Sequence, residues 1–132
     1  MSDETDWTSP RGHVVVSRRW KYAPPPWVLF EAVVNDLRRW MYPLTDRVEP
    51  IVENRRKPDR VVLGPWDDSS VTAVELQIDP DGQGSAMTVL AYADVPVLDD
   101  EARRRVRHRL GTIFGAGLRD WVEVRRIAKE TK

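Results

Sequence analysis

Apolar residues recur at helical spacing over the last part of the chain, from Asp99 to about Lys129. This periodicity predicts one long amphipathic helix. Asp99 and neighbouring carboxylates suit its positive end, and basic residues up to Lys129 suit its negative end. Gly117 falls at the centre of the expected buried face and Gly115 on the opposite face. A mid-helix glycine costs about 1 kcal/mol relative to alanine, so we expect either a close approach to the sheet or a cavity at Gly117. The apolar stripe comprises Val106, Leu110, Ile113, Phe114, Gly117, Leu118, Trp121 and Val124.

A shorter helical pattern covers residues 26–42. Proline suits the first turn of a helix, so Pro24-Pro25-Pro26 favours a start at Pro26. Asn35-Asp36 indicates a break into two short helices, and Pro43 ends the second. The expected buried stripe is Trp27, Phe30, Val33, Val34, Leu37 and Met41.

Alternating apolar and polar positions predict five strands. Residues 13–22 carry Val14, Val16, Trp20 and Tyr22 on one face, with Arg18 on that same face. Proline cannot donate to a strand ladder, so Pro50 places residues 47–54 at a sheet edge. A short strand follows over 60–63, and 71–78 pairs with 85–95 around a glycine-containing turn at 79–84.

The composition of the chain argues against several classes of function. The 132 residues suit one domain over 13–129, preceded by a flexible tail over 1–12. Lys+Arg and Asp+Glu both number 21, so no basic excess points to nucleic acid. The chain has no cysteine, which excludes disulfides and thiolate chemistry and leads us to expect a cytoplasmic protein. The acidic first six residues do not resemble a signal peptide, and no apolar run approaches the roughly 20 residues of a membrane span.

Few residues suggest chemistry. Neither histidine has a converging partner, so we expect no metal site, no cofactor and no catalytic triad. Glu75 and Tyr92 are expected on the solvent side of the sheet. Arg18 and Arg103 are expected on inner faces, where each either holds a carboxylate at a pocket mouth or extends to water. The arginine run over 103–109 is expected to be solvated and neutralised by nearby acids, with a partner-binding patch as the alternative.

Several motifs, taken together, resemble the START-like superfamily. Its opening is similar to residues 19–24 (RWKYAP), followed by 28–33 (VLFEAV) and 37–40 (LRRW). Residues 58–63 (PDRVVL) with Trp66, and the hairpin over 70–89, resemble the branch named for the activator of the ninety-kilodalton heat-shock ATPase. Polyketide cyclases and pollen-allergen-type binders are relatives. Over residues 13–125 the resemblance implies an α+β helix-grip fold, an antiparallel sheet wrapped on a long C-terminal helix. The family usually has two more strands between Trp40 and Pro58, which here are 18 positions apart, so we expect about five strands.

The resemblance implies three kinds of function. The first is binding of an apolar small molecule between sheet and helix, without an assigned catalytic residue. The second is a co-chaperone-like module with a protein partner or a homodimer, which an exposed apolar patch beside the arginine run would favour. The third is a cyclase or aromatase, which needs an inward acid–base pair. We expect neither a nucleic acid nor a membrane as a partner. The expected pocket residues are Arg18, Trp20, Trp66, Leu76, Met87, Val89, Ala91, Arg103, Leu110, Phe114, Gly117 and Trp121.

Overall fold

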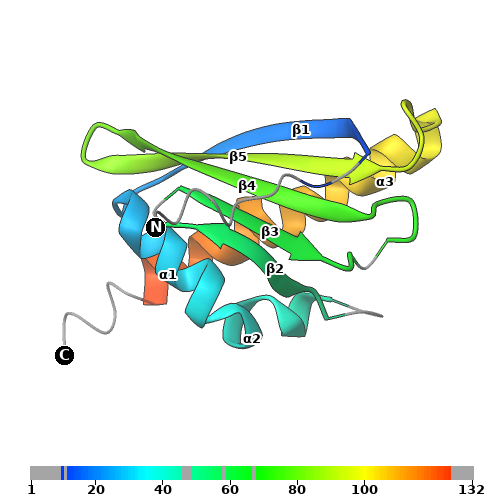
Figure 1. Cartoon of the computed structure of the whole chain (residues 1–132). Helices are drawn as coiled ribbons and strands as arrows, with labels where there is room; N and C mark the ends of the chain where they lie inside the picture. Colours follow the sequence, from blue (N-terminus) through cyan, green and yellow to red (C-terminus); the bar gives the residue numbers. More distant parts are fainter. Residues whose placement is uncertain (1–9, 11, 46–48, 58, 67, 126–132) are drawn as a thin grey trace.

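Figure 1 shows the chain in a computed structural model, which describes residues 10, 12–45, 49–57, 59–66 and 68–125. Most of the expected tail and the last residues of the expected helix lie outside these ranges. The elements are β1 (His13–Tyr22), α1 (Pro26–Asn35), α2 (Leu37–Trp40), the 3₁₀ turn η2 (Tyr42–Leu44), β2 (Ile51–Arg56), β3 (Arg60–Gly64), β4 (Ala73–Asp81), β5 (Gly84–Ala93), α3 (Asp100–Leu110) and the π-type segments η3 (Gly111–Leu118) and η4 (Asp120–Arg125).

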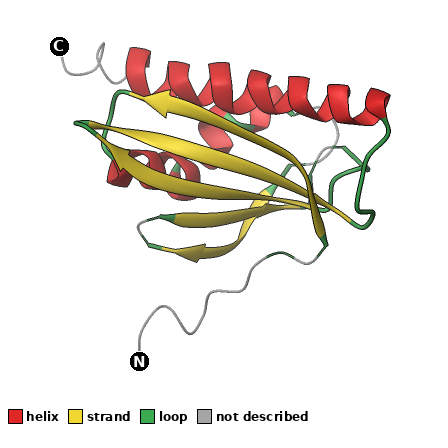
Figure 2. Ribbon diagram, turned by 90° about the horizontal axis from the view of Figure 1, so that it is seen from above, coloured by secondary structure: helices red, strands yellow, loops and turns green. Residues whose placement is uncertain are grey.

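The strands form one antiparallel sheet in the order β1-β5-β4-β3-β2. The long helix formed by α3, η3 and η4 crosses one face of this sheet (Figure 2). Helix α1 contacts β3, β4, β5 and η4, so it covers the same face as the long helix. The expected helix-grip architecture is therefore confirmed. Strand β2 lies at an edge as expected, but it begins at Ile51, so Pro50 precedes the strand and does not interrupt it.

Strand β1 departs from simple alternation near its start. Val14 is opposite Tyr92 and Val16 is opposite Ala91, so a bulge separates the two valines. An extra residue in one strand turns the following side chains to the other face. Val14 is therefore 46% exposed while Val16 is buried. The prediction that both valines share the inner face was wrong for Val14.

Helix α1 buries a slightly different face from the one predicted. It starts at Pro26 and ends at Asn35, and α2 starts at Leu37, so the expected break is confirmed. Leu29 and Val33, one turn apart, are fully buried. Trp27 in the first turn is instead 59% exposed, which corrects its place in the buried stripe.

The β4–β5 hairpin is tighter than expected, because β4 continues to Asp81. Pro80 pairs with Ser85 beyond Gln77, where the pairing with β3 stops, so its missing N–H removes no bond to β3. Gly82 has φ +62°, a conformation that glycine adopts without a steric penalty. The turn therefore needs only the residues around Gly82.

The long helix is fixed at its start and near its end. The Asp99 carboxylate accepts a 2.8 Å hydrogen bond from the Ala102 N–H, which confirms the expected cap. Near the other end, Arg119 donates to the Lys21 carbonyl at 3.0 Å, and Glu123 accepts from the Ala23 N–H at 3.0 Å. The helix is thereby held against the end of β1.

Candidate functional site between the sheet and the long helix

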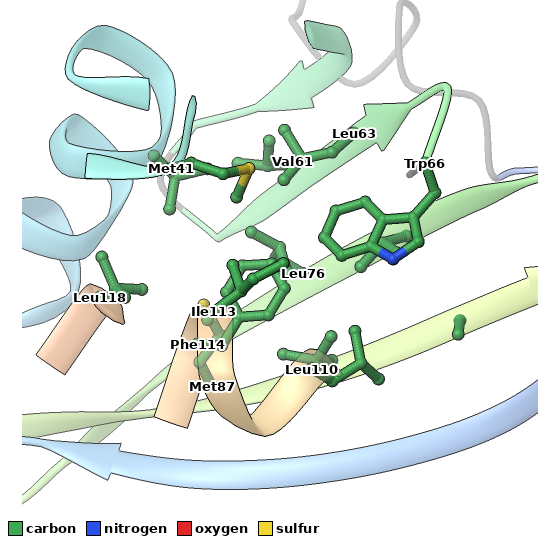
Figure 3. Packing of buried hydrophobic residues seen from close by; sticks show 14 of the residues in the cluster. Met41, Val61, Leu63, Trp66, Leu76, Met87, Leu110, Ile113, Phe114 and Leu118 are labelled. Atoms are coloured by element: carbon green, nitrogen blue, oxygen red, sulfur yellow. The ribbon is translucent and has the colours of Figure 1, made fainter. Parts of the chain in front are cut away.

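The space between the sheet and the long helix is lined by the side chains that the apolar pattern pointed to. Figure 3 shows several of them converging from β3, β4, β5 and the helix. The structure brings six predicted pocket residues together with no solvent exposure. These are Leu76, Met87, Val89, Ala91, Leu110 and Phe114.

Phe114 occupies the middle of this space. Its ring stacks on Trp66 with centroids 5.9 Å apart and planes 13° apart. Trp40 meets it edge-on at 6.1 Å and donates from its indole N–H to the Ala32 carbonyl at 2.9 Å. The Tyr22 hydroxyl donates to the carbonyl of Phe114 at 2.7 Å, and burial raises the pKa of Tyr22 well above its usual value. Two aromatic rings and one hydrogen bond to the backbone therefore meet at Phe114.

The indole N–H of Trp66 is the exception in this interior. Trp66 is 3% exposed, and its ring points from the end of β3 into the space near Phe114 (Figure 3). Among the described residues, its nitrogen is the one buried side-chain polar atom without a hydrogen-bond partner. Buried polar groups are nearly always paired, and leaving one unpaired costs about 1–3 kcal/mol.

On the β1 side, the long side chains of Arg18 and Trp20 lie against the helix. Arg18 donates to the Arg107 carbonyl at 3.0 Å, and its guanidinium lies 4.7 Å from the centre of the Trp20 ring. A Cβ atom at Gly115 would lie 2.8 Å from the Trp20 indole nitrogen. The prediction that Gly115 points away was therefore wrong, because this residue packs against β1. Trp20 and Arg18 are half-buried and close this side of the space.

Gly117 marks a close approach and not an open space. A Cβ atom there would collide with Cδ1 of Leu44, which comes from η2. Of the two expectations at Gly117, close packing is the one observed, although the neighbour is η2 and not the sheet. Trp121, the last predicted pocket residue along the chain, is half-buried and packs against the core.

Gly117→Leu is expected to lower the free energy of unfolding by about 1 kcal/mol, because the new side chain must push the half-buried Leu44 aside. Leu44→Ala in the same chain should recover part of the loss, since it removes the colliding atom. Urea unfolding of the single and double variants measures this. A fully stable Gly117→Leu variant would contradict the observed packing.

Two arginines on α3 hold the loops that carry Trp66 and Leu44. Arg105 donates to the Asp68 carboxylate at 2.7 Å and to the Ser70 hydroxyl at 3.0 Å. Arg109 donates to the Leu44 carbonyl at 2.6 Å. One turn of helix thus fastens both loops over the interior.

The stabilisation that the Arg105–Asp68 interaction provides should depend on pH. Burial alone raises the pKa of Asp68, but hydrogen bonds from Arg105 and Ser70 outweigh it, so its pKa lies below the usual value. The interaction therefore stabilises the fold above the unfolded-state pKa of about 3.9 and is lost as the pH falls through the lower folded-state pKa. We expect the stability difference between wild type and Asp68→Asn to shrink below about pH 4. Urea unfolding across the acidic range tests this.

Asp79→Asn serves as the control, because Asp79 is 56% exposed and lies 3.9 Å from Arg19. Such exposed pairs contribute little. A stability difference for Asp68→Asn that stays constant down to about pH 2 would contradict the lowered pKa.

Three other candidate residues, Arg103, Glu75 and Tyr92, lie outside the interior between the sheet and the long helix. Arg103 is 49% exposed and pairs with Asp100 at 2.8 Å, so it is not in the interior. Glu75 was expected at the solvent side but is only 1% exposed, which is a correction. Its carboxylate accepts hydrogen bonds from Tyr92 at 2.9 Å, Arg60 at 3.0 Å and Gln77 at 2.9 Å.

The Glu75 cluster lies on the outer face of the sheet. Glu75 is next to Leu76 along β4, so it points away from the long helix. Burial, together with the bond to Glu75, raises the pKa of Tyr92 to about 12. Tyr22 and Glu75 are the buried titratable side chains of the described residues, and they lie on opposite faces. Among the described residues, Tyr22 is therefore the buried titratable side chain on the face that the long helix covers.

The described residues offer little for binding a metal or spanning a membrane. No three histidine or carboxylate side chains among them could hold a metal ion. None of the described helices is both long and apolar enough to cross a bilayer. Both histidines are exposed.

Sequence reasoning missed the contacts that close the interior. Leu44 and Asp68 meet Arg109 and Arg105 of the long helix from distant positions in the chain, and no local pattern distinguishes them from ordinary surface residues. Tyr22 was placed on the correct face by alternation, but its bond to a helix carbonyl depends on how far the helix lies from β1.

No protein-family model and no curated protein matches this sequence. Solved structures do match. CalU16 from Micromonospora echinospora has a TM-score of 0.60 at 14% identity, over 86% of this chain and 81% of that one. Ara h 8.0201 has a TM-score of 0.56 at 14% identity, over 81% and 95%. The Aha1 dimer from Colwellia psychrerythraea has a TM-score of 0.54 at 13% identity, over 83% and 96%.

The chain has the START-like, helix-grip fold. At these identities the likeness concerns the fold alone. The helix-grip arrangement accounts for the position of the site, because the long helix covers one face of the sheet.

Proposed function

We propose that this helix-grip protein binds a small, largely apolar molecule that carries one hydrogen-bond acceptor, between the sheet and the long helix beside Trp66. The observation that carries the proposal is the buried Trp66 N–H without a partner among the described residues. A carbonyl or ether oxygen of a ligand would accept this hydrogen bond and remove the cost of the unpaired donor. The surrounding apolar side chains would bury the rest of the ligand.

Binding requires side chains to move. Phe114 and Leu76 are fully buried and Leu44 fills the space beside Gly117, so the ligand must displace protein atoms. The segments that carry Trp66 and Leu44 are the ones that Arg105 and Arg109 fasten. Release of these two arginines from the loops would open the interior without unfolding the sheet.

Native mass spectrometry with a library of apolar compounds tests the proposal. Ketones should be paired with hydrocarbons of the same shape. Wild type should bind the ketones in preference, and Trp66→Phe should lose about tenfold in ketone affinity, the factor expected for one hydrogen bond of about 1.4 kcal/mol. Affinity for the matched hydrocarbon should fall less than affinity for the ketone, because only the ketone loses a hydrogen bond.

Stability of the ligand-free Trp66→Phe variant is the control. Trp66→Phe removes buried ring atoms that stack on Phe114, so it should lower the free energy of unfolding by about 1–2 kcal/mol although the N–H has no partner. Absence of any bound compound would contradict the binding proposal. A ketone affinity that falls no more than the hydrocarbon affinity in this variant would show that the N–H does not bind the ligand.

A further inference from the structure

The arginine run of α3 divides into two sets. Arg105 and Arg109 are used inside the molecule, where they hold the loops over the interior. Arg103, Arg104 and Arg107 are exposed. We call Arg103, Arg104, Arg107 and His108 the basic face of α3.

Two arginines of the basic face have no direct ion-pair partner among the described residues. Arg103 pairs with Asp100, but the side chains of Arg104 and Arg107 have no hydrogen-bond or ion-pair partner among the described residues. Arg103 and Arg107 are four residues apart on the helix, where like charges repel and destabilise it. Arg18, which donates to the Arg107 carbonyl, adds a further positive charge beside this face. These positive charges have no evident role in stabilising the fold. They would interact favourably with carboxylates of a bound partner.

Exposed apolar side chains lie immediately before this helix. Val95 and Val97, in the loop between β5 and α3, are 47% and 70% exposed. Leu98 is buried and fixes the loop against the core. Two aliphatic side chains are therefore exposed just before the N-terminus of the helix that carries the basic face.

We propose that the basic face of α3, with Val95 and Val97, binds an acidic segment of a partner protein that carries aliphatic side chains. Charge complementarity to Arg104 and Arg107 selects the acidic residues, and the valines supply apolar contact. Asp100 and Glu101 at the helix start repel acid, so they fix the direction in which the segment lies. The proposal does not depend on the ligand site.

A protein segment fits better than nucleic acid. The whole chain carries 21 basic and 21 acidic residues, so it generates no general attraction for a polyanion. Exposed valines also gain nothing from a phosphate backbone, whereas they would be covered by aliphatic side chains of a peptide.

Selection of a displayed library of short random peptides against the full chain tests this without assuming a partner. Enriched peptides should be rich in Asp and Glu with interspersed Leu, Ile or Val. Their affinity should fall by about tenfold or more in Arg104→Glu/Arg107→Glu, since both charge contacts reverse. Arg38→Glu/Arg39→Glu, exposed on α2, is the matched control and should change affinity less than about twofold. Val97→Ser should weaken binding while leaving its salt dependence unchanged.

Other outcomes would overturn the proposal. These are the absence of enrichment, enrichment without acidic residues, or equal losses in the α3 and α2 variants. Peptides that bind only after Asp3→Asn/Glu4→Gln/Asp6→Asn would show that the chain's own acidic residues compete for this face. Single-stranded oligonucleotides that bind better than the peptides would assign the face to nucleic acid instead.

Discussion

Replacing Phe114 with alanine is expected to lower the free energy of unfolding by about 3–5 kcal/mol. Phe114 is fully buried, and its ring contacts Trp66 on one side and Trp40 on another. The lost burial, the lost aromatic contacts and the remaining cavity all act in the same direction. Two-state urea unfolding, followed by tryptophan fluorescence, measures the change.

Trp27→Ala is the control for Phe114→Ala, because it also removes an aromatic ring but one that is 59% exposed. We expect it to change the unfolding free energy by less than about 1 kcal/mol. If Phe114→Ala were no more destabilising than Trp27→Ala, the Trp66–Phe114–Trp40 cluster would not be the centre of the core. Apolar compounds that restore the stability of Phe114→Ala would fill the cavity and locate the interior that we propose as the ligand site.

Replacing Arg60 with methionine is expected to cost about 1–3 kcal/mol, since it leaves a buried carboxylate without its cation. Glu75 loses the 3.0 Å bond from Arg60 and keeps those from Tyr92 and Gln77. The Arg60 side chain is 31% exposed, so water partly replaces it and holds the loss below that of a wholly buried pair.

A double-mutant cycle with Glu75→Gln isolates this interaction. Arg60→Met should destabilise the Glu75→Gln background much less than the wild-type background, because a neutral amide needs no cation. Equal effects in both backgrounds would mean that Arg60 acts through its packing. The result bears on the fold only, because the cluster lies on the sheet face away from the proposed ligand site.

The sequence determined the elements and the faces they bury, because these depend on residues close together in the chain. The periodicity from Asp99 to about Lys129 predicted the long helix, and Asp99 its cap. Proline and glycine marked the start of α1, the edge strand and the β4–β5 turn. The joint order of motifs led to the helix-grip fold.

Some local expectations were wrong where one residue altered the pattern. A bulge moved Val14 to the outer face, and alternation alone cannot reveal an extra residue in a strand. Glu75 was correctly placed on the face away from the helix, yet it is buried. Its burial depends on Arg60, Gln77 and Tyr92, which come together only when β3, β4 and β5 pair in register.

Only the tertiary structure decided what fills the interior. The sequence around Gly117 does not distinguish a cavity from a close contact with a side chain. In the structure Leu44, over seventy positions away, occupies the space beside Gly117. The tertiary structure also separated Arg105 and Arg109, which hold loops, from Arg104 and Arg107, which face solvent. Helical spacing gives each side chain a direction, but the partner it meets depends on distant segments brought together by folding.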